Sequence, residues 1–240
     1  MVAGARFDLE AKSRRIDIYR RTFDVVVSAL LLLVAVPLTI LLAVGSALAL
    51  GAWPFFTQER VGLGGEMFRF WKVRTLRPDV PGYIDKHQLD VDRIPRFCQI
   101  LRDLHLDELP QLFLVLRGKM SLVGPRPEMA HLHNRLAPAF ADLRTSVRPG
   151  CTGMWQVSEL CTELIGAAPQ YDRFYLAHRT LRLDVWILFR TALNMLGIGR
   201  CITLADVPAW AVTREDDVVI VLDAPHWDDV NVSMPTAAAR

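Results

Sequence analysis

The amino-acid sequence predicts an α+β fold that is mainly helical and carries an N-terminal membrane helix. Residues 25–58 contain no Asp, Glu, Lys or Arg and consist largely of Leu, Val, Ala and Ile. Residues 56–76 place aromatic and β-branched residues on both sides of a glycine-rich turn, which predicts a short β-hairpin. Apolar residues recur with helical spacing at 106–116 and again at 181–196. These patterns together predict one hairpin among several helices, next to a membrane segment.

The apolar segment Val25–Leu50 is long enough to cross a bilayer, because about 20 apolar residues in a helix span the hydrocarbon. It is longer than the core of a signal peptide and no processing site follows it, so no cleavable signal is expected. Pro37 lies near its middle, where it removes a backbone donor. Two structures fit this pattern: a kinked spanning helix, or a helix-break-helix that enters and leaves on the same side.

Basic residues flank the apolar segment on both sides. They are Lys12, Arg14, Arg15, Arg20 and Arg21 before it, and Arg60, Arg69, Lys72, Arg74 and Arg77 after it. A spanning helix normally has its excess of Lys and Arg on one side only, namely the cytoplasmic side. The balanced flanks therefore favour re-entry, with both ends facing the cytoplasm, although a kinked spanning helix stays open on charge alone.

The charge distribution indicates negatively charged partners. Residues 201–240 contain seven acidic residues and two arginines, so this tail carries −5 and residues 1–200 carry +7. A basic body beside a membrane segment favours anionic lipid headgroups or phosphorylated ligands. No nucleic-acid-binding motif is present, so no nucleic-acid partner is expected. The four cysteines form no C-x-x-C pair and are expected to be free thiols in a reducing compartment.

Two elements are predicted in the central part of the chain. The hairpin should turn at Gly62-Leu63-Gly64-Gly65. The stretch Leu106–Leu116 should form a helix, with Asp107 near its start, Pro110 in its first turn and Gly118 after its end.

Further elements are predicted towards the C-terminus. The segment 181–196 is amphipathic, and either packing in the core or a position at the membrane interface explains it. Within the acidic tail, the apolar run 218–222 fits a single strand.

The densest group of charged residues surrounds Asp107. It consists of Arg102, Asp107, Glu108, Arg126 and Glu128. An Asp-Glu pair on a helix is most often only a charged surface. Here, however, Asp107 would lie near a helix N-terminus, where free amides and the helix dipole attract anions. A carboxylate among arginines suits attack on a phosphate, because the arginines neutralise the incoming charge, and Glu108 could hold a divalent metal or move a proton.

Ordered motifs extend over roughly residues 20–195. The central ones are Leu106-Asp107-Glu108-Leu109-Pro110-Gln111-Leu112 and Gly118-Lys119-Met120-Ser121-Leu122-Val123-Gly124-Pro125-Arg126-Pro127-Glu128. Before them stand Arg21-x-Phe23-Asp24, Phe56-x-Gln58-Glu59-Arg60-Val61-Gly62 and Lys72-x-Arg74-Thr75. After them stand Arg144-x-x-Val147-x-Pro149-Gly150-x-Thr152-Gly153, Gln156-Val157 and Tyr171-Asp172-x-x-Tyr175. In this order the motifs resemble the bacterial sugar transferase family, the monotopic polyprenyl-phosphate phosphoglycosyl transferases, in the short form without an added multi-spanning N-terminal domain.

The resemblance implies a two-step, ping-pong transfer of a sugar 1-phosphate from a nucleoside diphosphate sugar, expected to be a UDP-sugar, to polyprenyl (undecaprenyl) phosphate. Asp107 matches the family nucleophile, which forms a phosphosugar-aspartyl intermediate and releases nucleoside monophosphate. Glu108 matches the second member of the catalytic dyad, and the resemblance associates the two carboxylates with Mg²⁺. Further matching positions are expected to contact phosphate or substrate: Lys72, Arg102, Arg126, Arg144 and Asp172. The reaction would be the first membrane step in the assembly of exopolysaccharide, capsule, O-antigen or glycoprotein glycan.

The resemblance also implies a re-entrant N-terminal membrane helix broken at Pro37. Val36 stands where the family usually has Ser, so no hydroxyl is available there for the backbone group that the proline frees. The expected organisation is a basic segment at 1–22, the re-entrant helix at 23–52, a cytosolic transferase domain at 53–200, and an acidic tail at 201–240 without an assigned role. The catalytic domain would lie on the cytoplasmic face of the bacterial inner membrane, in contact with membrane lipid.

Two other functions fit parts of the sequence. A membrane-anchored glycosyltransferase would move the sugar alone and release a nucleoside diphosphate, whereas a scaffold would keep the fold without activity. The intact motif positions, among them Asp107 and Glu108, favour the phosphosugar transfer. The sequence does not indicate which sugar is transferred, which polymer follows, or the oligomeric state.

Overall fold

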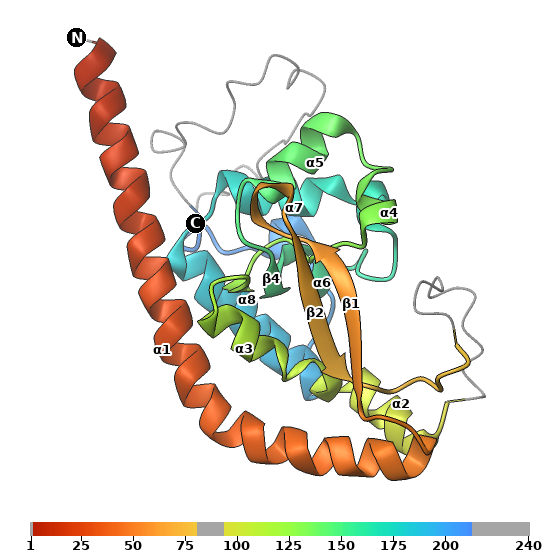
Figure 1. Cartoon of the computed structure of the whole chain (residues 1–240). Coiled ribbons are helices and arrows are strands. Elements are labelled where there is room, and N and C mark those ends of the chain that lie inside the picture. Colours follow the sequence, from red (N-terminus) through yellow and green to blue (C-terminus); the bar gives the residue numbers. More distant parts are fainter. Residues whose placement is uncertain (1, 81–93, 213–240) are drawn as a thin grey trace.

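The computed structural model describes residues 2–80 and 94–212, with side chains from Asp17 onward. A long N-terminal helix runs along one side of a smaller body and then bends beneath it (Figure 1). The body combines a two-stranded hairpin with short helices, which confirms the predicted α+β, mainly helical fold. The predicted strand at 218–222 lies outside the described residues, as does most of the acidic tail.

Helix α1 (Val2–Leu50) is one helix of 49 residues with Pro37 inside it. Figure 1 shows that it bends within its apolar part, so that its two arms point in different directions. Proline cannot donate its backbone nitrogen to the carbonyl four residues earlier, which weakens the helix locally and permits a kink. The predicted break therefore takes the form of a bend in a continuous helix.

Much of the apolar part of α1 faces away from the body. Asp17–Leu50 is apolar and long enough to cross a membrane, yet only 22% of its most apolar window is buried in the protein. Leu33 and Leu48 are 74% and 81% exposed, while Leu32 and Ala35 pack into the core. The core helix of a soluble protein would be mostly buried, so length, composition and exposure together favour contact with lipid.

The predicted hairpin is present. Strand β1 (Phe55–Val61) pairs antiparallel with β2 (Met67–Val73), with Phe55 opposite Val73 and Val61 opposite Met67. The turn between them contains Gly64 and Gly65 at φ values of +65° and +78°, a backbone conformation that side-chain-bearing residues rarely adopt. The glycines of the motif thus serve the turn.

The body is completed by short helices and one further strand pair. The helices are α2 (Arg96–Asp103), α3 (Gln111–Leu116), α4 (Ala130–His133), α5 (Pro138–Thr145), α6 (Met154–Val157), α7 (Pro169–Ala177) and α8 (Leu181–Met195). Strand β3 (Ser121–Val123) pairs in parallel with β4 (Gly150–Thr152). All four cysteines are free thiols.

Helix α8 confirms the predicted amphipathic segment. Leu183 and Ile187 are fully buried in the core, whereas Val185 and Phe189 are 46% and 58% exposed. One face of the helix therefore packs against the body, and apolar residues also remain on its outer face; the position at the membrane interface stays a prediction.

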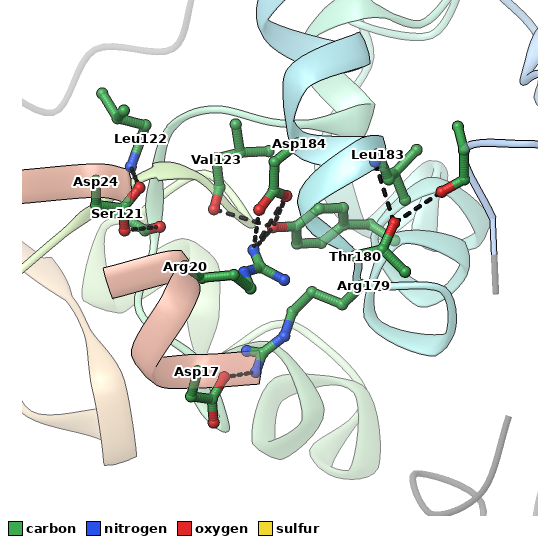
Figure 2. Close-up of polar contacts among 12 residues, drawn as sticks. Asp17, Arg20, Asp24, Ser121, Leu122, Val123, Arg179, Thr180, Leu183 and Asp184 are labelled. Carbon is green, nitrogen blue, oxygen red and sulfur yellow. Dashed lines mark hydrogen bonds and ion pairs between the residues drawn. The ribbon is translucent and has the colours of Figure 1, made fainter. Parts of the chain in front are cut away.

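Buried polar contacts fix the N-terminal arm of α1 to the body (Figure 2). The guanidinium of Arg20 forms an ion pair with Asp184 on α8 at 2.8 Å and donates a hydrogen bond to the hydroxyl of Tyr175 on α7. The Tyr175 hydroxyl also lies 2.9 Å from Asp184 Oδ1. Burial raises the pKa of Asp184 to about 6, although the Arg20 cation acts in the opposite direction. Both charged side chains are nearly buried, so each requires the other.

Two more residues of the same arm reach other elements of the body. Asp24 accepts hydrogen bonds from the Ser121 hydroxyl at 2.6 Å and from the Leu122 backbone N–H at 3.1 Å. Arg21 donates to the carbonyls of Val115 at 2.7 Å and Leu116 at 3.1 Å, at the C-terminal end of α3. A cation is favourable there because the last carbonyls of a helix lack partners within it. The helix is thereby bonded to β3, α3, α7 and α8.

Replacing Asp184 with Asn should weaken this attachment. The substitution leaves Arg20 buried without its carboxylate, which typically costs about 3–5 kcal/mol. We expect a lower thermal unfolding midpoint for the detergent-solubilised protein. The control Glu163→Gln removes an exposed carboxylate and should leave the midpoint unchanged. Equal midpoints for Asp184→Asn and the wild type would contradict a stabilising role for the pair.

Candidate active site

The centre of the candidate site is a contact between the hairpin and a buried carboxylate. Lys72 lies near the end of β2, and Asp107 lies in a single 3₁₀ turn, Leu106–Glu108. Lys72 Nζ is 3.3 Å from Asp107 Oδ2. Asp107 is only 3% exposed, whereas the Lys72 side chain is 22% exposed. The lysine thus compensates the buried charge and reaches the solvent side of the site.

The local backbone differs from the predicted continuous helix over 106–116. The chain forms the 3₁₀ turn Leu106–Glu108 and then, from Gln111, the separate helix α3. Pro110 explains the division, because it has no N–H to donate to the carbonyl of Leu106. Asp107 therefore stands on a tight turn before α3, and the expectation that it lies in the first turn of an α-helix is wrong. His105, with φ of 53°, directs the chain into this turn.

The second carboxylate faces a different cation. Glu108 Oε1 lies 3.2 Å from Arg126 Nη2, and the side chains are 16% and 22% exposed, respectively. Gln111, which is 2% exposed, also helps to hold Glu108 in its charged form. Sequence reasoning gave Gln111 no role, although its position three residues after Glu108 on a helical segment could have indicated the contact.

The two carboxylates differ in their electrostatic environment. Burial raises the pKa of Asp107; the Lys72 cation lowers it, and the charge of Glu108 raises it further. Burial also disfavours charge on Glu108, but Arg126 and Lys72 outweigh this and lower its pKa to about 2. Glu108 is thus firmly ionised at neutral pH, whereas Asp107 gains a proton more readily than an ordinary aspartate.

Close backbone packing positions Arg126. It follows β3 after Gly124 and Pro125, where β3 and β4 lie side by side. A Cβ atom on Gly124 would lie 2.7 Å from the Arg148 carbonyl oxygen, and one on Gly150 would lie 2.1 Å from the Gly124 nitrogen. Only glycine fits at such distances. The segment after Arg126 is joined to the hairpin, because Val61 N–H donates to the Glu128 carbonyl at 2.9 Å.

Arg144 and Asp172 lie behind Arg126. Arg144 Nε is 2.7 Å from Asp172 Oδ2, and both side chains are at most 4% exposed. Arg144 Nη2 donates to the Arg126 carbonyl at 2.6 Å. The structure thus connects these two predicted site residues to the backbone of Arg126 and places their charged groups against each other.

Arg102 lies at the other edge of the site, on α2. Its Nη1 is 3.3 Å from the hydroxyl of Thr75, and its charge lowers the pKa of Asp107. Thr75 is 2% exposed and belongs to the motif that includes Lys72. The structure brings the predicted residues into three direct ion pairs, with Arg102 near Asp107: Lys72–Asp107, Glu108–Arg126 and Arg144–Asp172.

The arrangement offers a carboxylate nucleophile among cations, suited to a negatively charged substrate. Within residues 17–80 and 94–212, no three His, Cys, Asp or Glu side chains group as a metal site. Mg²⁺, however, is usually held by one or two protein carboxylates, with substrate phosphates and water completing its ligands. Adjacent Asp107 and Glu108 fit a metal ion of that kind, bound together with a phosphorylated substrate.

Comparisons with known proteins show which sequences the chain resembles. A UDP-glucose:undecaprenyl-phosphate glucose-1-phosphate transferase from Caulobacter vibrioides is 39% identical over 191 residues, which cover 75% of this chain and 71% of that protein. The Sinorhizobium fredii exopolysaccharide production protein ExoY is 30% identical over 190 residues, covering 72% of this chain and 84% of that protein.

A longer relative matches over part of its length. The undecaprenyl-phosphate galactose phosphotransferase of Salmonella typhimurium is 35% identical over 190 residues, covering 72% of this chain but only 39% of that protein. Residues 15–197 match the family model for bacterial sugar transferases, and this range includes Arg20, Arg21 and Asp24 of α1 and all the site residues described above. The chain belongs to the bacterial sugar transferase family.

Proposed function

We propose that the chain transfers a sugar 1-phosphate from a UDP-sugar to undecaprenyl phosphate at the start of exopolysaccharide assembly. The relatives support the substrate classes, since their names combine undecaprenyl phosphate with glucose or galactose and include exopolysaccharide production. The observation that carries the proposal is the buried Asp107 carboxylate, paired with Lys72 and adjacent to the Glu108–Arg126 pair. As a member of its family, the chain is an enzyme of the phosphoglycosyl transferase class.

In the first step, a carboxylate oxygen of Asp107 attacks the phosphorus that carries the sugar. The bond from this phosphorus to the oxygen of the nucleoside monophosphate breaks, and the monophosphate leaves with the electron pair. As the donor approaches, Lys72 exchanges its contact with Asp107 for a phosphate oxygen, which frees the carboxylate to attack. Arg126, together with Arg102 at the opposite edge of the site, neutralises charge on the diphosphate.

In the second step, a phosphate oxygen of undecaprenyl phosphate attacks the phosphorus of the aspartyl intermediate. The bond between this phosphorus and Asp107 breaks, so the carboxylate is restored and the lipid diphosphate sugar leaves. A covalent intermediate divides one difficult displacement into two easier ones. Arg144 and Asp172 serve this chemistry indirectly, by holding the backbone of Arg126.

Mg²⁺ would be held by Asp107 and Glu108 together with the diphosphate of the donor. When bound, it supplies charge neutralisation on the transferring phosphate and a better leaving group. Glu108 suits this role because its low pKa keeps it ionised at neutral pH. Arg126, which pairs with Glu108, keeps the carboxylate oriented before the ion arrives.

Asp107→Asn should abolish transfer, because the amide is not a nucleophile under these conditions. We expect a loss of at least about 10⁴-fold in monophosphate release, comparable to removal of other catalytic nucleophiles. Asp103→Asn, an exposed carboxylate four residues earlier, is the matched control and should keep full activity. The assay identifies the nucleotide product, since release of UDP would indicate transfer of the sugar alone. Normal UMP release by Asp107→Asn would exclude this nucleophile.

Lys72→Gln should shift the acidic limb of the pH–rate profile towards higher pH. Asp107 must be ionised to attack, so the rate rises as pH increases through its pKa. Burial already raises that pKa and Lys72 opposes the effect, so loss of the lysine raises it further. The control is Lys119→Gln, since Lys119 is exposed and pairs with Glu66 at 3.7 Å. The pH dependence of UMP release tests this; an unshifted limb in Lys72→Gln would contradict the coupling.

We also propose that α1 re-enters the membrane and that the body lies on the cytoplasmic face, where UDP-sugars are present. Single cysteines at Arg15 and Glu66 test this in a background with the four native cysteines replaced by alanine. Glu66 is suitable because its side chain is 77% exposed. A membrane-impermeant thiol reagent should label both positions from the cytoplasmic side only. Labelling of the two positions from opposite sides would establish a spanning helix instead.

A further inference from the structure

A second group of arginines lies between the N-terminal arm of α1 and the body. Four arginines and two aspartates line a cavity there: Arg20, Arg21, Arg148, Arg179, Asp17 and Asp24. The cavity has a volume of about 40 Å³. A water molecule needs roughly 10–15 Å³ by the same measure, so the cavity has room for a small polyatomic group. None of these six residues belongs to the Asp107 site.

The partners of these arginines leave positive charge in excess. Arg20 pairs with Asp184, and Arg179 pairs with Asp17, which is half exposed. Among the described residues, the contacts of Arg21 and Arg148 are with backbone carbonyls, which carry no full charge. With Asp184 counted behind Arg20, the four cations still face three carboxylates. An anion is the ligand that would balance this group.

One of the residues that line the cavity carries a buried polar atom without a partner. The Arg20 side chain is 8% exposed, and its Nη1 has no hydrogen-bond partner among the residues the structure describes. Arg20 uses one nitrogen, Nη2, for both Tyr175 and Asp184. Figure 2 shows the other terminal nitrogen of Arg20 on the side of Arg179. Burial and the charge of Arg20 both lower the pKa of Arg179. Asp17 and Asp184 act in the opposite direction, yet the pKa of Arg179 remains lowered, so a further anion would stabilise the two cations.

The position of the cavity defines where its ligand would come from. The α1 residues that line it, from Asp17 to Asp24, end directly before Val25, where the uncharged apolar part of the helix begins. The polar boundary of an apolar membrane helix is the depth at which lipid phosphates lie. Arginine is the side chain best suited to phosphate, because its planar donors match the phosphate oxygens.

We propose that this cavity, the α1 arginine cavity, is a binding site for a phosphate group, supplied either by the headgroup of an anionic membrane lipid or by free phosphate. The phosphate would accept a hydrogen bond from the free Nη1 of Arg20 and lie against Arg148 and Arg179. It would separate the facing cations and fasten the arm of α1 to the body. The proposal does not depend on the transferase reaction.

Titration of the full chain with inorganic phosphate in a nonionic detergent tests the site. A Lys72→Gln background weakens phosphate binding near Asp107, so the remaining saturable binding reports on the cavity. Arg148→Gln should weaken that binding at least about tenfold, since a charge-assisted hydrogen bond is lost. Arg148→Lys should weaken it less. The control Arg135→Gln removes an exposed arginine elsewhere and should change nothing.

Arg179→Gln is a second variant of a residue that lines the α1 arginine cavity, in case Arg148→Gln alters the fold. Thermal unfolding midpoints in phosphate-free buffer show whether each variant remains folded. Absence of saturable phosphate binding, or equal affinity in the wild type, Arg148→Gln and Arg179→Gln, would overturn the proposal. The experiment does not measure activity at the Asp107 site. A negative result would therefore overturn the phosphate site without bearing on the proposed transferase function.

Native mass spectrometry distinguishes the two sources of phosphate. The protein is extracted from nanodiscs of phosphatidylcholine with or without phosphatidylglycerol, and retained lipids are counted. If a lipid headgroup is the ligand, the wild type retains one phosphatidylglycerol that Arg148→Gln loses and inorganic phosphate displaces. If free phosphate is the ligand, the titration is positive and no lipid depends on Arg148. Either result supports the site.

Discussion

The structure depends on ion pairs between charged side chains that would be costly to bury alone. Arg20 and Asp184 are both nearly buried, and neither could remain charged there without the other and the Tyr175 hydroxyl. This pair joins the membrane-directed helix to α7 and α8, at residues more than 150 positions away in sequence. The same rule governs the candidate active site, where Lys72 compensates Asp107 and Arg126 compensates Glu108. The attachment of the helix and the charge state of the carboxylates thus follow from one constraint.

The helix and the active site also share structural elements. Arg21 bonds the C-terminal end of α3, and the 3₁₀ turn with the two carboxylates lies directly before the start of α3. Asp24 bonds Ser121 and Leu122 on β3, and the chain leaves β3 towards Arg126. α1 also packs directly against the turn that carries both carboxylates, because Leu38 and Leu42 lie in one apolar cluster with Leu106. A change in how α1 packs against the body would alter the positions of Asp107 and Glu108 through α3 and β3.

Local patterns predicted the elements well, and contacts between distant segments poorly. The hairpin, the long N-terminal helix and the amphipathic segment at 181–196 all form, because turn glycines and periodic apolar residues act over short distances. The division at Pro110 was missed, since a helical pattern continues on both sides of it. The parallel pair of β3 and β4 has three residues in each strand, too few to show a period. The motifs named the site residues, but only the structure separates Lys72, which contacts Asp107, from Arg144, which lies behind Arg126.

The long sequence distance between Arg20 and its partner has a consequence for biosynthesis. Asp184 is added to the growing chain 164 residues after Arg20, which at 5–20 residues per second is a delay of about 10–30 s. Within this interval the apolar part of α1 leaves the ribosome, before the α8 surface that would receive Arg20 has been made. The helix can therefore reach a membrane first, while Arg20 is still hydrated. The catalytic body then closes around a helix already in place, and its folding completes the anchor's polar contacts last.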